Sequence, residues 1–190
     1  MKKFLTATLV LGLLGAFTSP VMATPQEDLK NFRAYFEKRF PKTPFYDFIN
    51  GVYSIDPVGR ENWEAIEEFP PYETALSDGE EMWNTPFANG KTYGSCFGDD
   101  PAQRKNYPYW DSKRKMVITL PLAINECREA NGEKPLKYKK GAIADLLAYM
   151  SYESRGQEIN VEIPDDPDAL AAYNEGKSFY FARRGQLNFS

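Results

Sequence analysis

One stretch decides the fold: residues 76–83 read LSDGEEMW in the middle of the chain. Its apolar residues recur at helical spacing around Gly79, and they predict a helix near Glu73 to Trp83. The same spacing returns near the end of the chain, where residues 173–180 read YNEGKSFY around Gly176. We interpret the two stretches as a weak internal repeat, although unrelated helices often share such apolar spacing.

The composition limits the function classes. The chain has 190 residues, a net charge of −4 and 15% aromatic residues, which is enough for one domain or two small ones with a real core. An acidic chain of this kind is not built to bind nucleic acid or an anionic membrane by charge. The sequence contains no histidine, which excludes a Ser-His-Asp triad, an imidazole zinc site and a complete Cys-x-x-Cys-His haem attachment within these residues.

The first 23 residues predict a secretory signal peptide. Lys2 and Lys3 form a charged start, an apolar run follows from Phe4 to Phe17, and Val21-Met22-Ala23 provides a cleavage site. The alternative is a membrane anchor, but the uninterrupted apolar run is shorter than the roughly 20 residues that cross a bilayer. We therefore expect an exported protein located in the periplasm.

Cys96 and Cys127 are the two cysteines of the chain, 31 positions apart. An oxidising compartment favours their joining in a disulfide. Two free thiols, or one free thiol and one that coordinates a metal, remain as alternatives on these grounds. A redox-active pair is disfavoured because the two residues are far apart and form no Cys-x-x-Cys motif.

The remaining pattern predicts a mainly α-helical chain. Asn131-Gly132 is a good helix stop, and Gly156 ends a strongly amphipathic helix. The short apolar run from Val117 to Leu120 is not assigned by its periodicity. We expect helices at 25–40, 73–83, 122–130, 140–154 and 169–181, an irregular wrapping segment at 41–71 held by Phe45, Tyr46, Phe48, Tyr53 and Trp63, and a linker at 157–168.

A glycine between apolar residues of a helix, followed by a glycine-containing loop and a cysteine, resembles the start of a class I cytochrome c domain. In that fold the small residue lets the first helix cross closely over the last one, here 140–154. Four further segments resemble the SoxA family, the A subunits of the SoxAX c-type cytochromes of periplasmic sulfur oxidation. They are NGKTY at 89–93, LAINECREANGE at 122–133, AYMSYESRG at 148–156 and YFARRGQLN at 180–188, and the resemblance extends from about residue 25 to the end.

The resemblance implies an enzyme with two tandem cytochrome c domains, an L-cysteine S-thiosulfotransferase. Such a protein oxidatively couples thiosulfate to a cysteine of a carrier protein and passes the electrons to a c-type cytochrome. The implied partners are a small SoxX-type cytochrome c subunit, a SoxYZ-type sulfur carrier, thiosulfate and an electron-accepting cytochrome c. The implied cofactor is heme c, bound in the second domain.

The resemblance also has consequences for the first domain, at 72–156. Some relatives attach a haem there through Cys-x-x-Cys-His with a downstream cysteine on the iron, whereas this sequence reads CFGDD at 96–100. Cys127 lies where the downstream ligand would be, which matches a single-haem branch in which a Cys96–Cys127 disulfide replaces the first haem. We therefore expect a haem-less cytochrome c-like domain with no metal ligand.

The segment 169–190 corresponds in this resemblance to the first helix of a truncated second cytochrome c domain. The family's second haem attachment and its catalytic cysteine would follow Ser190, so we expect no catalytic residue in this chain. Arg183 and Arg184 are the candidate cofactor-binding residues, because guanidinium groups suit haem propionates or thiosulfate. The alternative for both is a solvated helix end.

We expect the residues present to act structurally, as a disulfide-linked lid and docking surface beside the active haem. Two other functions remain open on the sequence. One is a non-catalytic periplasmic adaptor or binding domain with a relic cytochrome c fold. The other is a plain electron-transfer cytochrome without sulfur chemistry.

Overall fold

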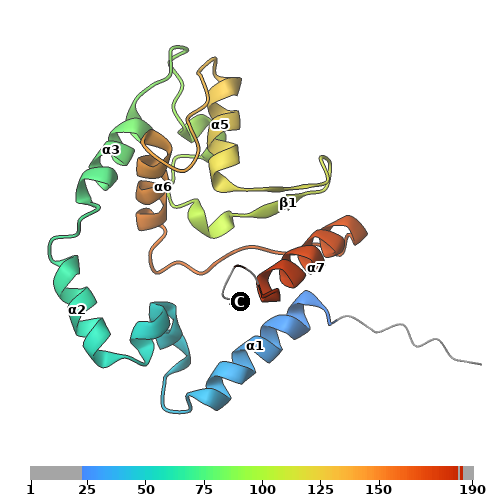
Figure 1. Ribbon diagram of the computed structural model, residues 1–190. Coiled ribbons are helices and arrows are strands. Elements are labelled where there is room, and N and C mark those ends of the chain that lie inside the picture. The colour runs from blue at the N-terminus through green and yellow to red at the C-terminus, as the bar shows by residue number, and fades with distance from the viewer. Residues whose placement is uncertain (1–22, 184, 186–190) are drawn as a thin grey trace, which may run out of the picture. The chain divides into compact units, whose positions relative to one another are not determined.

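The computed structural model describes residues 23–183 and 185, and it divides the chain into two compact units, 1–41 and 42–190. Arg184 therefore lies outside the described residues. The expected signal peptide, residues 1–23, also lies outside them except for Ala23. Figure 1 shows the course of the chain. Among the described residues, no helix is both long and apolar enough to cross a bilayer.

The first unit contains helix α1, Pro25–Arg39, as the sequence predicts. Thr24 caps its first turn by accepting from the backbone N–H of Glu27, and the Glu27 carboxylate accepts from the Thr24 N–H in return. This capping box satisfies backbone donors that the first turn leaves unpaired. Lys38 and Arg39 complement the helix dipole in the last turn.

The second unit is mainly helical and carries one small antiparallel hairpin. Its elements, in chain order, are η1 Phe45–Ser54 (a 3-10 helix), α2 Pro57–Glu67, α3 Glu73–Asn84, α4 Gly94–Phe97, η2 Arg104–Asn106 (also 3-10), β1 Tyr109–Asp111, β2 Met116–Ile118, α5 Leu120–Ala130, α6 Ala142–Glu153 and α7 Pro167–Phe181.

The prediction of an irregular segment at 41–71 was wrong in part, because this stretch contains η1 and α2. Asp56 caps α2 by accepting from the Gly59 N–H, and Pro57 occupies the first helical position. Tyr53 does stack on Trp63, with ring centroids 5.7 Å apart. Tyr46, by contrast, is exposed and anchors nothing in the core.

The hairpin explains the apolar run that periodicity left unassigned. Trp110 pairs with Val117 across the two short strands. In the turn, the Asp111 side chain accepts from the backbone N–H of Arg114, from its guanidinium Nε and from the Lys113 N–H. These hydrogen bonds, the backbone one from Arg114 first, lower the pKa of Asp111.

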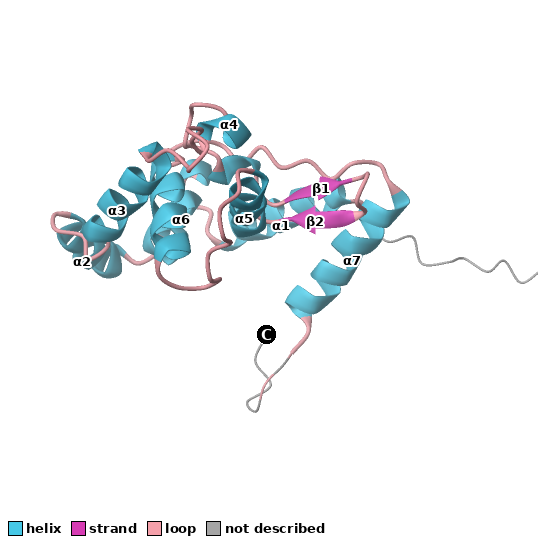
Figure 2. Cartoon of the chain, turned by 90° about the horizontal axis from the view of Figure 1, so that it is seen from above, coloured by secondary structure: helices cyan, strands magenta, loops and turns pink. Residues whose placement is uncertain are grey.

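The core is built where α3 crosses α6, and Figures 1 and 2 both show α5 packed beside this pair. Gly79 is buried at the crossing. A Cβ atom there would lie 2.3 Å from the backbone oxygen of Asp145 and 2.7 Å from the Cβ of Tyr149. The crossing inferred from the resemblance is therefore present. The cluster of buried side chains around it comprises Trp83, Phe87, Tyr93, Leu120, Ile124, Cys127, Leu146 and Met150.

The same geometry predicts how much stability the domain loses when a methyl group is added at Gly79. Gly79→Ala should lower the free energy of unfolding by about 1–3 kcal/mol, because the added carbon meets backbone atoms that cannot rotate away. Gly176→Ala is the matched control, since no described atom lies within 4 Å of its added carbon and alanine favours the helix. Urea denaturation followed by circular dichroism measures both. Equal stability of the two variants would contradict the close crossing.

Candidate functional site

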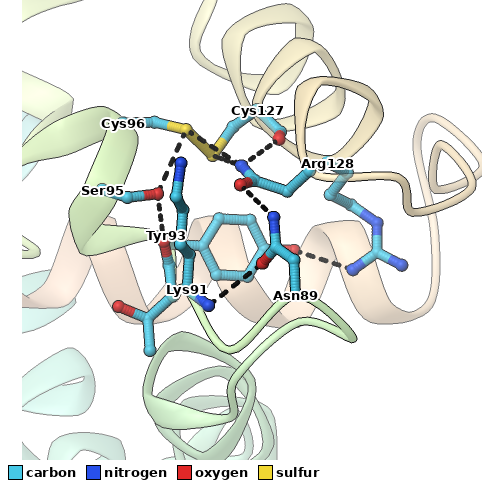
Figure 3. The surroundings of a disulfide bond; sticks show 9 residues. Asn89, Lys91, Tyr93, Ser95, Cys96, Cys127 and Arg128 are labelled. Atoms are coloured by element: carbon cyan, nitrogen blue, oxygen red, sulfur yellow. Dashed lines mark hydrogen bonds between the residues drawn. A yellow bond between two sulfur atoms is a disulfide. The ribbon is translucent and has the colours of Figure 1, made fainter.

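The two cysteines form a disulfide. Cys96 lies on the short helix α4 and Cys127 on α5, with their Cα atoms 6.0 Å apart (Figure 3). Cys127 is buried, whereas Cys96 is exposed to solvent. The bond joins the long loop after α3 to the helix that lines the core. The alternatives of free thiols or a metal-bound thiol do not describe this structure.

An asparagine network surrounds the disulfide. The Asn131 side-chain amide donates to the backbone oxygen of Cys127 at 2.8 Å, and its nitrogen lies 3.7 and 3.8 Å from the two sulfur atoms. Asn89 donates to the Asn131 side-chain oxygen at 2.8 Å and accepts from the Lys91 N–H. In the sequence Asn131 is recognisable only as part of a helix stop, and its role beside the disulfide is not evident there. A buried polar side chain needs such partners, and here they tie the loop to the disulfide.

A second asparagine was missed entirely. Asn125 is buried on α5 and forms two hydrogen bonds with the backbone of Leu136, donating to its oxygen at 3.0 Å and accepting from its N–H at 2.8 Å. The pair fixes the segment between α5 and α6. An asparagine in the middle of an otherwise apolar helix face was the available indication in the sequence.

An aromatic cluster fills the space beneath the disulfide. The Tyr93 ring stacks on Trp83, with centroids 6.0 Å apart, and meets Phe87 edge-on at 4.9 Å. Arg128 donates to the Tyr93 hydroxyl at 3.0 Å, as Figure 3 shows. Burial raises the pKa of Tyr93, and it raises the pKa of Tyr107 to about 12. Both phenols therefore stay protonated at neutral pH.

This domain does not fit a covalently attached haem. Haem attachment needs two thiols and a histidine ligand, but both sulfur atoms are bonded to each other and the sequence has no histidine. The core beside the disulfide is filled by side chains, among them Trp83, Tyr93, Leu146 and Met150. We derive no catalytic step through a haem in this domain.

A surface groove of about 500 Å³ lies between α3, α5 and the start of α6, with Asp78, Glu81 and Asp145 among its lining residues. Its basic residue, Arg128, is committed to neighbours: besides Tyr93 it donates to the backbone oxygen of Lys134 and pairs with Glu133 at 3.5 Å. Within the described part of the chain, no group of three or more metal-ligating side chains comes together.

The hairpin holds the start of α7. Trp110 donates its indole N–H to Asp166 at 3.0 Å, and Lys115 pairs with Asp168 at 2.7 Å. Asp166 is also the N-cap of α7, because its other oxygen accepts from the Asp168 N–H. The hydrogen bond from that backbone N–H, followed by the one from Trp110, lowers the pKa of Asp166. A strand pair that sequence reasoning did not assign thus orients the last helix.

The candidate anion-binding arginines remain a prediction. Arg183 is exposed just after the end of α7. Arg184 lies outside the described residues, so the structure places neither of them near an anion site.

The disulfide should be a major contributor to stability. The Cys96→Ser/Cys127→Ser double variant should lower the free energy of unfolding by about 2–4 kcal/mol, because the open chain gains conformational freedom in the unfolded state. Urea denaturation with and without dithiothreitol measures the effect, and reduction should bring the wild type to the level of the variant. An unchanged urea midpoint on reduction would refute this role.

The stability that the Asp166 carboxylate gives to the start of α7 should decrease as the pH falls. A carboxyl group with a lowered pKa stabilises the fold above its unfolded-state pKa of about 3.9 and loses that contribution as pH falls through the folded value. Asp166→Ala should therefore speed amide hydrogen exchange in the first turn of α7 at neutral pH, because it removes the acceptor of the Asp168 N–H, and the difference from wild type should shrink in acid. Asp165→Ala is the control, and exchange in Asp166→Ala that matches this control would contradict the capping role.

The chain matches several known proteins. Residues 78–159 match the family model described as the SoxA/TsdA cytochrome c domain. The chain is 64% identical to the L-cysteine S-thiosulfotransferase subunit SoxA of Allochromatium vinosum, over 98% of this chain and 67% of that protein. It is 48% identical to the protein of the same description from Chlorobaculum thiosulfatiphilum, over 100% of this chain and 70% of that protein.

A solved structure shares the fold. The crystal structure of SoxXA from P. pantotrophus superposes with a TM-score of 0.53 at 28% sequence identity, covering 64% of this chain and 47% of that one. The identity over nearly the whole chain, the matched cytochrome c domain and this superposition agree with the segments singled out in the sequence. The chain belongs to the SoxA family.

Proposed function

We propose that this chain is part of an L-cysteine S-thiosulfotransferase subunit. In the proposed reaction a carrier-protein thiol and thiosulfate form a new S–S bond, the thiol releases its proton, and two electrons leave the sulfur atoms. The electrons pass to a c-type cytochrome. The observation that carries the proposal is the 64% identity, over 98% of the chain, to a relative of that description.

In this proposal the domain around the disulfide is structural and the haem lies elsewhere. Family membership in a c-type cytochrome implies heme c, which would accept the electrons of the sulfur oxidation. The described residues offer it no thiol pair and no histidine, so we place its covalent attachment outside this domain. Trp110 and Asp166 then orient α7, which we propose as the first helix of the haem-bearing domain.

The location and the partners follow from the same proposal. We propose a periplasmic protein, supported by the disulfide, since oxidising compartments preserve such bonds. A SoxX-type small cytochrome is supported as a partner by the superposition on a SoxXA structure. A SoxYZ-type carrier and an acceptor cytochrome complete the reaction. Arg183 and Arg184 are proposed as donors to haem propionates or thiosulfate.

The activity is testable in the full-length protein purified with its small cytochrome subunit. With thiosulfate, the carrier and oxidised cytochrome c, the carrier mass should increase by one thiosulfate, and two cytochromes should be reduced for each carrier modified. A carrier whose cysteine is alkylated is the control, and it should show neither change. Cytochrome reduction without a change in carrier mass would instead indicate a plain electron-transfer cytochrome and overturn the proposed transferase.

A further inference from the structure

Helix α2 has an inner face that is already packed. Trp63 on that face stacks on Tyr53 of η1, and the Arg60 guanidinium pairs with Asp47 of η1 at 2.9 Å. These contacts account for one side of the helix. An amphipathic helix that packs on one side normally presents polar residues on the other.

The outer face of α2 carries exposed apolar side chains among its polar ones. Val58, Ile66 and Phe69 are 69%, 56% and 85% exposed, and Phe69 lies two residues after the end of the helix, beyond the C-cap Glu68. Asn62 and Ala65 are also exposed, and they share one face of α2 with Val58 and Ile66, because positions 58, 62 and 66 are four residues apart and position 65 lies three after 62. We call these five residues the α2 stripe. Single exposed apolar side chains are ordinary, but a row of them on a helix whose other side is packed marks an interaction surface.

The α2 stripe is held in a defined orientation. At the end of α2, Glu67 accepts from Arg155 at 3.1 Å and from the Tyr72 hydroxyl at 2.7 Å. Arg155 also donates to the Tyr72 hydroxyl at 2.6 Å, and its guanidinium lies 4.4 Å from the ring centroid of Tyr152 on α6. These interactions attach α2 to the cytochrome c-like domain, so the stripe is presented from a fixed support.

The charges beside the α2 stripe indicate which kind of partner surface is complementary to it. Glu61 and Glu68 follow one edge of the helix beside the stripe, on either side of Glu64, which pairs with Arg60 at 3.0 Å. Residues 42–69 contain six acidic residues against two basic ones. A second copy of the chain would bring carboxylates against carboxylates. The complementary partner has an apolar face with lysine or arginine residues along one edge.

The degree of exposure favours a permanent partner. Interfaces of permanent complexes are more apolar than those of transient encounters, which keep polar surfaces that remain soluble alone. In the proposed function the small cytochrome subunit is the permanent partner, whereas the carrier and the acceptor cytochrome bind transiently. We propose that the α2 stripe is the docking surface for the small cytochrome subunit, an inference that rests on the heterodimer of the proposed function.

A charged residue in the stripe tests the proposal. Ile66→Asp, made in the full-length protein, should weaken binding of the separately purified small cytochrome subunit at least about tenfold by isothermal titration calorimetry. Ile159→Asp is the matched control, because Ile159 is 80% exposed in the segment before α7 and lies outside the stripe. Both positions are exposed, so both variants should fold, which circular dichroism and melting temperature verify.

The acidic edge is tested in the same assay. The double variant Glu61→Lys/Glu68→Lys should also weaken binding, and its affinity should depend less on salt than that of the wild type. Glu129→Lys/Glu158→Lys changes the net charge equally at exposed positions away from α2 and should bind with wild-type affinity and salt dependence. An equal loss in both double variants would mean that only overall charge matters and would overturn the assignment to this edge.

The outcomes separate this inference from the proposed function. If the wild type does not bind the small cytochrome at all, the proposed heterodimer itself fails. If wild type and Ile66→Asp bind equally well, the heterodimer stands and the stripe is not its docking surface. Slow hydrogen exchange along the outer face of α2 in the isolated protein, or self-association abolished by Ile66→Asp, would show that the chain or a second copy covers the stripe, and would also overturn the inference.

Discussion

The bond between Cys96 and Cys127 constrains the part of the domain that has the least regular structure. Between α3 and β1 the chain forms only one turn of α-helix and one of 3-10 helix. Helical hydrogen bonds therefore do little to hold this loop. The disulfide fixes its middle to α5, and Tyr93 from the same loop is thereby held in the core against Trp83. The packing of the aromatic cluster depends on that covalent attachment.

In the proposed function the Cys96–Cys127 disulfide stands where relatives attach a haem. A haem attached through two cysteines would link a loop to a large planar group and fill the interior with it. Here the link is direct, and the volume is taken up by aromatic and aliphatic side chains. The close crossing of α3 and α6 and these buried side chains together form the core of the domain.

Much of the fold could be predicted because it rests on local patterns. The apolar stripe of α6 and the stop at Asn131-Gly132 are properties of short windows, and both predictions are confirmed. Gly79 could be interpreted because a close helix crossing requires the absence of a side chain. The pairing of the two cysteines came from the family resemblance and from the expected compartment, since the sequence alone left free thiols open.

What could not be predicted depends on contacts between distant residues. Strands β1 and β2 are three residues long, too short for an alternating pattern, and Trp110 meets Asp166 across 56 positions. Asn125 and Asn131 gain their roles only when loops from elsewhere reach them. Helix α2 was missed because its apolar residues lie on two faces. That pattern obscures the single stripe by which an amphipathic helix is identified, and the same feature leaves one face of α2 open to a partner.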